Sequence, residues 1–93
     1  MAAEILVKST DETRFEVVVR EEGSETRHAV TVEPDYARKL AGTGTSAEEL
    51  VHQSFQFLLE HESKESILRR FNLREISHYF PGYEAEIRRR LSR

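Results

Sequence analysis

The first third of the chain alternates between apolar and polar residues in three short stretches, which is the pattern of strands with one buried face. The stretches cover Glu4–Lys8, Arg14–Arg20 and Arg27–Glu33, and polar turns separate them. Short polar connections usually join neighbouring antiparallel strands, so the pattern predicts a three-stranded antiparallel meander. The residues expected to face the core are Phe15, Val17, Val19, His28, Val30 and Val32.

The longest apolar pattern with helical spacing covers Ala47–His61, and we interpret it as the central helix. Either of two hydroxyl residues, Thr45 or Ser46, can cap its start together with the glutamate three residues later. A shorter helix is expected over Pro34–Ala41, because proline suits a first helical turn and Gly42 suits the residue after the end. The apolar residues expected on the central helix are Ala47, Leu50, Val51, Phe55, Phe57, Leu58 and Leu59.

Three shorter helical pieces are expected after the central helix. Ser63 can cap the first piece, and Asn72 with Glu75 can form a capping box that opens the second. Pro81 and Gly82 then interrupt the chain before the third. The residues expected to face inward are Ile67, Leu68 and Phe71 in the first piece, Leu73, Ile76, Tyr79 and Phe80 in the second, and Tyr83, Ile87 and Leu91 in the third.

These patterns together predict a single α+β domain over residues 1–93, with a sheet in residues 1–33 and about four helices in residues 34–93. Hydrophobic residues make up 38% and charged residues 33%, which is typical of a folded soluble chain. There is no cysteine, so disulfides and thiolate metal sites are excluded. No apolar run approaches the roughly 20 residues that span a bilayer. The start lacks the pattern of a signal peptide, so we expect a cytoplasmic protein with no membrane partner.

The net charge of −3 is distributed unevenly. Residues 1–33 hold eight acidic and four basic residues, whereas residues 64–93 hold four acidic and eight basic ones. Such asymmetry can mark an anion-facing end, but a solvated surface or internal ion pairs are the more common explanation. The C-terminal candidates for DNA or anion contact are Arg69, Arg70, Arg88 and Arg89.

Aromatic residues gather in the second half of the chain, where they could recognise a partner. The alternative is that aromatics at helical spacing close a core, which we expect for Tyr79 or Phe80 at least. The residues of this candidate partner interface are Phe57, Tyr79, Phe80 and Tyr83.

The sequence gives no catalytic, cofactor-binding or metal-binding prediction. His61 and Glu62 begin like a zinc-protease motif, but Glu65 stands where the second histidine belongs. Residues 42–46 lead into a helix N-terminus, yet the lysine and the third glycine of the phosphate-binding loops are missing. We interpret that segment as a helix–helix turn, and we expect a protein that is not an enzyme.

The segment Thr26–Glu60 resembles the ribbon–helix–helix pattern of small bacterial DNA-binding repressors and antitoxins. Arg27–Glu33 is similar to the strand of that family, and Pro34–Leu40 to its first helix. Thr43–Leu50 resembles the turn, and Val51–Glu60 the second helix. The resemblance implies a strand that pairs with its copy in a second subunit. It also implies that the outward strand residues face the major groove of DNA, namely Arg27, Ala29 and Thr31.

The function expected from these features is a non-enzymatic module that acts by binding protein, in an interaction or regulatory role. We expect self-association through apolar surface of the central helix and the C-terminal aromatics, or binding to another protein. The first alternative is a DNA-binding regulator or antitoxin of the ribbon–helix–helix type. The second is a small ligand-binding protein or enzyme. Residues 66–87 are also similar to small bacterial proteins of uncharacterised function, so this second resemblance implies no activity.

Overall fold

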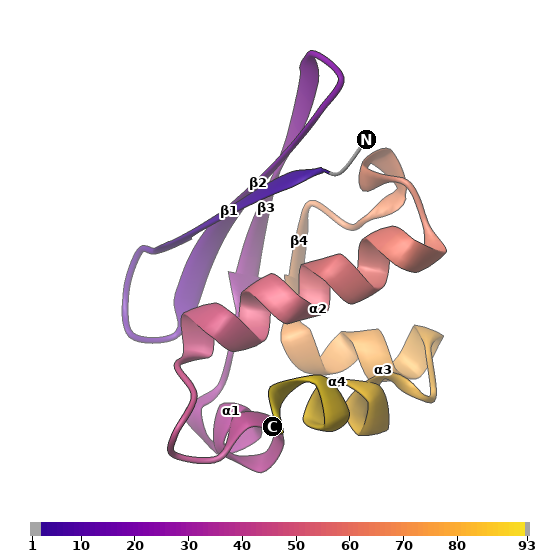
Figure 1. The fold of residues 1–93 in the computed structure, drawn as a ribbon. Helices are drawn as coiled ribbons and strands as arrows, with labels where there is room; N and C mark the ends of the chain where they lie inside the picture. Colours follow the sequence, from indigo (N-terminus) through magenta and orange to yellow (C-terminus); the bar gives the residue numbers. More distant parts are fainter. Residues whose placement is uncertain (1–2, 93) are drawn as a thin grey trace.

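A computed structural model describes residues 3–92, which form a four-stranded sheet with helices packed against one face (Figure 1). The predicted α+β class is confirmed, although the sheet has one strand more than the predicted meander. The strands run in the order β1-β2-β3-β4, and only β3 and β4 pair in parallel. The elements are β1 (Glu4–Ser9), β2 (Arg14–Glu21), β3 (Ser24–Thr31), α1 (Pro34–Ala41), α2 (Ala47–His61), η1 (Lys64–Ser66), β4 (Arg70–Asn72), η2 (Leu73–Glu75), α3 (Ile76–Tyr79) and α4 (Tyr83–Leu91).

The hairpin between β2 and β3 is tighter than the sequence pattern indicates. Glu21 lies opposite Ser24, so only two residues form the turn. Both have positive φ, 51° at Glu22 and 81° at Gly23. Two-residue turns of this kind match the right-handed twist of the flanking strands. Strand β3 therefore begins before the expected Arg27, and the expected inward residues of both strands are buried.

The fourth strand, β4, replaces the helix that was expected to follow Ser63. Only the single turn η1 forms there, and the chain then extends beside β3, where the Ala29 N–H donates to the Arg69 carbonyl at 2.7 Å. Extended backbone turns Phe71 inward, with its ring centroid 6.0 Å from that of Phe55. The helix prediction is wrong for this segment because its apolar spacing also suits a short edge strand.

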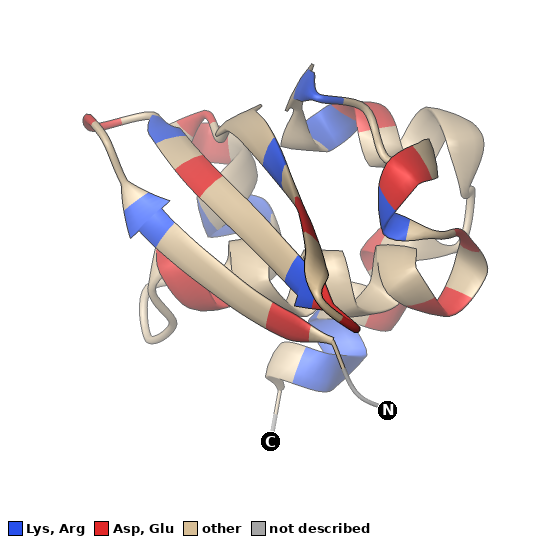
Figure 2. Ribbon diagram, turned by 90° about the horizontal axis from the view of Figure 1, so that it is seen from above, with Lys and Arg blue, Asp and Glu red and all other residues tan. Residues whose placement is uncertain are grey.

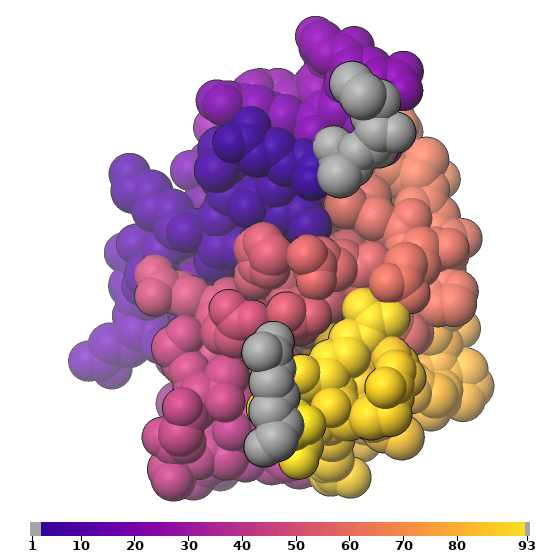
Figure 3. All heavy atoms as spheres, in the orientation of Figure 1, coloured from indigo at the N-terminus to yellow at the C-terminus, as the bar shows by residue number. Residues whose placement is uncertain are grey.

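Helix α2 covers the inner face of the sheet and lies between β1 and α4 (Figure 3). Its bounds agree with the prediction, and Ser46 is the cap, because its hydroxyl accepts the Glu49 N–H at 3.1 Å. Helix α1 also has the predicted bounds, and Gly42 after it has a φ of +67°. Within residues 3–92, no helix is long and apolar enough to cross a membrane.

Helices α3 and α4 complete the layer. The predicted capping box of Asn72 and Glu75 is present at the start of η2. Tyr83 and Ile87 of α4 are fully buried, as the spacing predicts. Tyr79 is not: it ends the four-residue helix α3 and is 66% exposed. The expectation that Tyr79 faces inward is therefore wrong, because a helix this short directs only one side, with Ile76, into the core.

Candidate functional site

An apolar groove of about 220 Å³ opens between the end of α2, the segment before β4 and helix α3. Leu68 and Tyr79 line it with 48% and 66% of their surfaces exposed. In the described part of the chain only one other large apolar side chain is exposed, Leu6 on β1, at 39%. The remaining apolar lining consists of the partly buried Phe80 and of buried core residues, namely Leu58, Ile67, Phe71 and Ile76.

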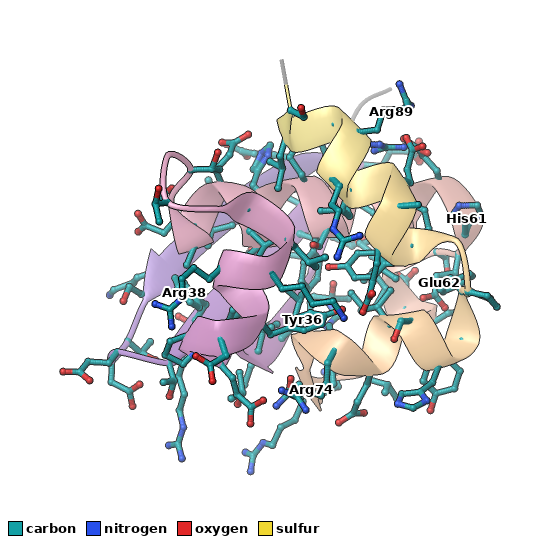
Figure 4. All side chains as sticks on the ribbon, turned by 90° about the horizontal axis from the view of Figure 1, so that it is seen from below. Tyr36, Arg38, His61, Glu62, Arg74 and Arg89 are labelled. Carbon is teal, nitrogen blue, oxygen red and sulfur yellow. The ribbon has the colours of Figure 1, made fainter. Side chains whose placement is uncertain are left out.

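Two carboxylates, those of Glu62 and Glu75, line the same groove. Neither forms an ion pair with any residue between 3 and 92. Glu75 accepts only the Asn72 backbone N–H, at 3.3 Å, and Glu62 lies beside His61 at the end of α2 (Figure 4). The groove therefore combines an apolar lining with negative charge that the described chain leaves uncompensated.

The four aromatic residues predicted to contact a partner lie close together, but two of them are buried in the chain itself. The rings of Phe57 and Tyr83 lie 5.4 Å apart between α2 and α4. The Tyr83 hydroxyl is 2.6 Å from that of Ser54, and burial raises the pKa of Tyr83. Phe57 and Tyr83 are thus core residues. Phe80, which is partly buried, and the exposed Tyr79 are the two that a partner can reach.

The central helix does not expose the surplus apolar face that was expected to support a homodimer. Its large apolar residues are buried against the sheet and α4, and only Leu59 is partly exposed. The expectation of surplus apolar surface on α2 is therefore wrong, because its apolar side chains pack inward while β1 and α4 flank the helix (Figure 3). The buried members are Leu50, Val51, Phe55, Phe57 and Leu58.

A second groove, of about 600 Å³, crosses the outer face of the sheet from β2 to β4, and we call it the arginine groove. Basic and acidic segments are mixed along this face of the sheet (Figure 2). The structure brings together here four of the residues predicted to contact anions, and it adds Arg14, which the sequence reasoning missed. The side chains with charged or hydroxyl groups in the lining are Thr10, Arg14, Glu16, Arg27, Thr31, Arg69 and Arg70.

The strand register of the hairpin could have identified Arg14 as a groove residue. The sequence shows that Arg14 faces outward at the start of the second strand, but it does not show which residue of the third strand lies opposite. In the structure Arg14 lies opposite Thr31, and Ala29 lies beside Arg70. The register across three strands is what gathers these residues.

The remaining predicted anion contacts, Arg88 and Arg89, lie on α4, and neither lines the arginine groove. Figure 4 shows Arg89 on that helix. Arg89 pairs with Glu86 at 2.6 Å, and Arg88 donates to the Lys39 carbonyl at 3.4 Å. Hydrogen bonds from Arg89 and Arg90 lower the pKa of Glu86 to about 2. The arginines of α4 thus support the helix and its neighbours, and they do not extend the arginine groove.

Among the histidines, His28 is buried and links β3 to the segment before β4. Its Nδ1 is 2.8 Å from the Leu68 carbonyl oxygen, and its Nε2 is 2.8 Å from the Thr26 hydroxyl. A carbonyl can only accept, so Nδ1 carries the proton and Nε2 accepts from Thr26. Burial lowers the pKa of His28, although the Leu68 carbonyl opposes this. His28 is a structural residue with both ring nitrogens paired.

The described residues contain no group of three His, Cys, Asp or Glu side chains that could hold a metal ion. In the same part of the chain every buried side-chain nitrogen or oxygen has a hydrogen-bond partner. The chain matches no family model, and neither the curated proteins nor the solved structures contain a match to it. The geometry of the two grooves is therefore the basis for a functional proposal.

Proposed function

We propose that the chain is a non-enzymatic protein-binding module, and that the apolar groove is its binding site. The observation that carries this proposal is the exposure of Leu68 and Tyr79 beside a buried apolar floor. Exposed large apolar side chains that gather at one concave place mark interaction sites more often than scattered ones do.

The size of the apolar groove suits one anchoring side chain of a partner. Burying a Leu, Ile, Phe or Met side chain contributes about 1.5–3 kcal/mol, which is too little for specific binding unless further contacts help. Glu62 and Glu75 can supply them, because both carboxylates line the groove and neither forms an ion pair with a residue between 3 and 92. The partner is therefore a protein segment with an apolar anchor flanked by lysine or arginine.

Selection from displayed random peptides tests this proposal. The purified chain is expected to enrich peptides that carry a large apolar residue next to a basic one. Leu68→Asp should weaken their binding about tenfold or more, because it places a charge in the apolar lining. Leu6→Asp is the matched control, since Leu6 is also exposed but lies on β1, outside the groove.

Two results would contradict the protein-binding proposal. One is a selection that enriches no peptide family. The other is binding that Leu6→Asp weakens as much as Leu68→Asp does, which would place the contact elsewhere. A second copy of the chain is a further partner to be tested, by comparing sedimentation of the wild type and Leu68→Asp.

The ribbon–helix–helix alternative ranks below protein binding for a geometrical reason. In that family the strand pairs with its copy in a second subunit, which requires a free strand edge. Here β3 has β2 on one side and β4 on the other, so both edges are occupied. The outward residues Arg27 and Thr31 nevertheless line one groove, the arginine groove.

A further inference from the structure

The arginine groove shares no lining residue with the apolar groove, so it offers a second and independent site. Four arginines line it, together with one acidic residue, Glu16. All four are exposed, which leaves their guanidinium groups accessible from solvent.

Three of these arginines form no ion pair within the described part of the chain. Arg27 pairs with Glu16 at 3.4 Å and with Glu25 at 3.2 Å. By contrast Arg14, Arg69 and Arg70 form no ion pair with any residue between 3 and 92. Glu16 lines the same groove, yet it pairs with Arg27 and not with the other three arginines.

The sheet itself gives the groove its shape. Ala29 faces outward on β3, with Glu16 as its partner on β2 and Arg70 as its partner on β4. The short side chain of Ala29 lies between the longer side chains of Glu16 and Arg70, which leaves a depression on the outer face of the sheet. The groove thus has a β3 floor with arginines at its sides. The Thr31 hydroxyl adds a hydrogen-bond donor, whereas the Thr10 hydroxyl already donates to the Arg14 carbonyl at 3.2 Å.

The charge pattern favours a compact anion. Arginine binds phosphate oxygens through two parallel N–H donors, and one phosphoryl group carries up to two negative charges. A long polyanion would also meet the acidic turn that holds Asp11 and Glu12, next to Arg14, and a chain with a net charge of −3. A carboxylate carries a single charge, which matches three free arginines less well.

We propose that the arginine groove binds a small phosphorylated molecule, with its phosphoryl group held among Arg14, Arg69 and Arg70. The groove volume of about 600 Å³ lies within the range of sites for small organic ligands. The two aromatic residues in the lining, Phe15 and His28, are both buried, so base stacking contributes nothing on this face. Recognition therefore rests on the phosphate.

Titration with sodium pyrophosphate at constant ionic strength tests the proposal, with NMR of the backbone amides and arginine Nε–H groups as the readout. Saturable shifts are expected at Arg14, Ala29 and Arg70. Arg70→Gln and Arg14→Gln should each raise the dissociation constant about tenfold, since each removes a charge-assisted contact. Amide spectra of the variants show at the same time that they remain folded.

Arg38→Gln is the matched control. It removes the same charge from an exposed arginine, which pairs with Asp35 on α1 and lies outside the groove. It should leave the dissociation constant within about twofold of the wild type. An equal loss in Arg38→Gln, or shifts that grow linearly without saturation, would overturn the site. Tighter binding of a short DNA duplex than of pyrophosphate would overturn the small-molecule ligand in favour of a nucleic-acid backbone.

Discussion

A pair of buried hydroxyl groups joins α2 to α4 in the middle of the helical layer. Ser54 Oγ lies 2.8 Å from the Leu50 carbonyl oxygen and 2.6 Å from Tyr83 Oη. The Ser54 hydroxyl has a single proton, which it donates to the carbonyl, so Tyr83 must donate to Ser54. Which hydroxyl donates to which therefore determines how much unfolding free energy is lost when either hydroxyl is removed.

Ser54→Ala should lower the free energy of unfolding by about 1–3 kcal/mol, because it leaves the buried Tyr83 donor unpaired. Tyr83→Phe leaves the bond from Ser54 to Leu50 intact and should cost about 1 kcal/mol. The double variant should cost less than the sum of the two single ones. Urea unfolding measures all three, and strictly additive costs would show that the two hydroxyls do not interact.

The second prediction at the residue scale concerns His28 and pH. Burial lowers the pKa of His28 in the folded chain, whereas the unfolded chain keeps a value near 6.5. The unfolded state then binds the proton more readily. The stability that His28 contributes is complete above pH 6.5 and is lost as the pH falls through the lower folded-state pKa.

NMR titration of the imidazole signals checks this directly. The midpoint of His28 is expected below 6.5, with the neutral ring protonated at Nδ1. Arg69 nearby acts in the same direction, because its positive charge disfavours a charged imidazole. A midpoint at or above 6.5 would contradict the buried, doubly bonded geometry.

Among the elements, α2 depends on the cap at its start. The sequence allowed Thr45 or Ser46 in this role, and the structure assigns it to Ser46. Ser46→Ala should therefore lower the free energy of unfolding by about 1 kcal/mol. Thr45→Ala is the control and should change it by no more than about 0.5 kcal/mol. Urea unfolding measures both variants. A larger loss of unfolding free energy in Thr45→Ala than in Ser46→Ala would show that Thr45 is the capping residue.

Elements with strong local signals could be predicted from the sequence. Pro34 and Gly42 bound α1, a hydroxyl cap and a regular apolar face define α2, and the spacing from Tyr83 defines α4. Strand β4 could not be predicted, because three residues show no period and Phe71 fits a helix pattern equally well. Its pairing with β3 depends on contacts between distant parts of the chain.

The candidate site was harder to predict than the fold. Tyr79 was named as a partner contact, but the groove beside it combines Leu58 of α2, Phe71 of β4 and Ile76 of α3. This groove forms only when β4 pairs with β3, so a prediction that lacked β4 could not include the groove. Phe57 and Tyr83 were wrongly predicted to lie at the interface. The sequence does not show which aromatic side chains are buried in the core of the chain.

At the scale of the whole molecule, the sheet separates the two grooves. The inner face carries the helical layer, and the apolar groove opens where three segments of that layer meet. The arginine groove crosses the outer face, which no helix among residues 3–92 covers (Figure 2). Because the grooves share no residue, variants in one should leave binding at the other unchanged, and each proposal can fail alone.

The central claim is that the apolar groove binds a protein segment, and an NMR titration of the labelled chain with a selected peptide tests it most directly. The account predicts that the largest amide shifts fall at Leu68, Phe71 and Tyr79, and that Leu68→Asp weakens the binding that causes them while Leu6→Asp does not. Shifts that leave these residues unmoved and gather on another surface would contradict it.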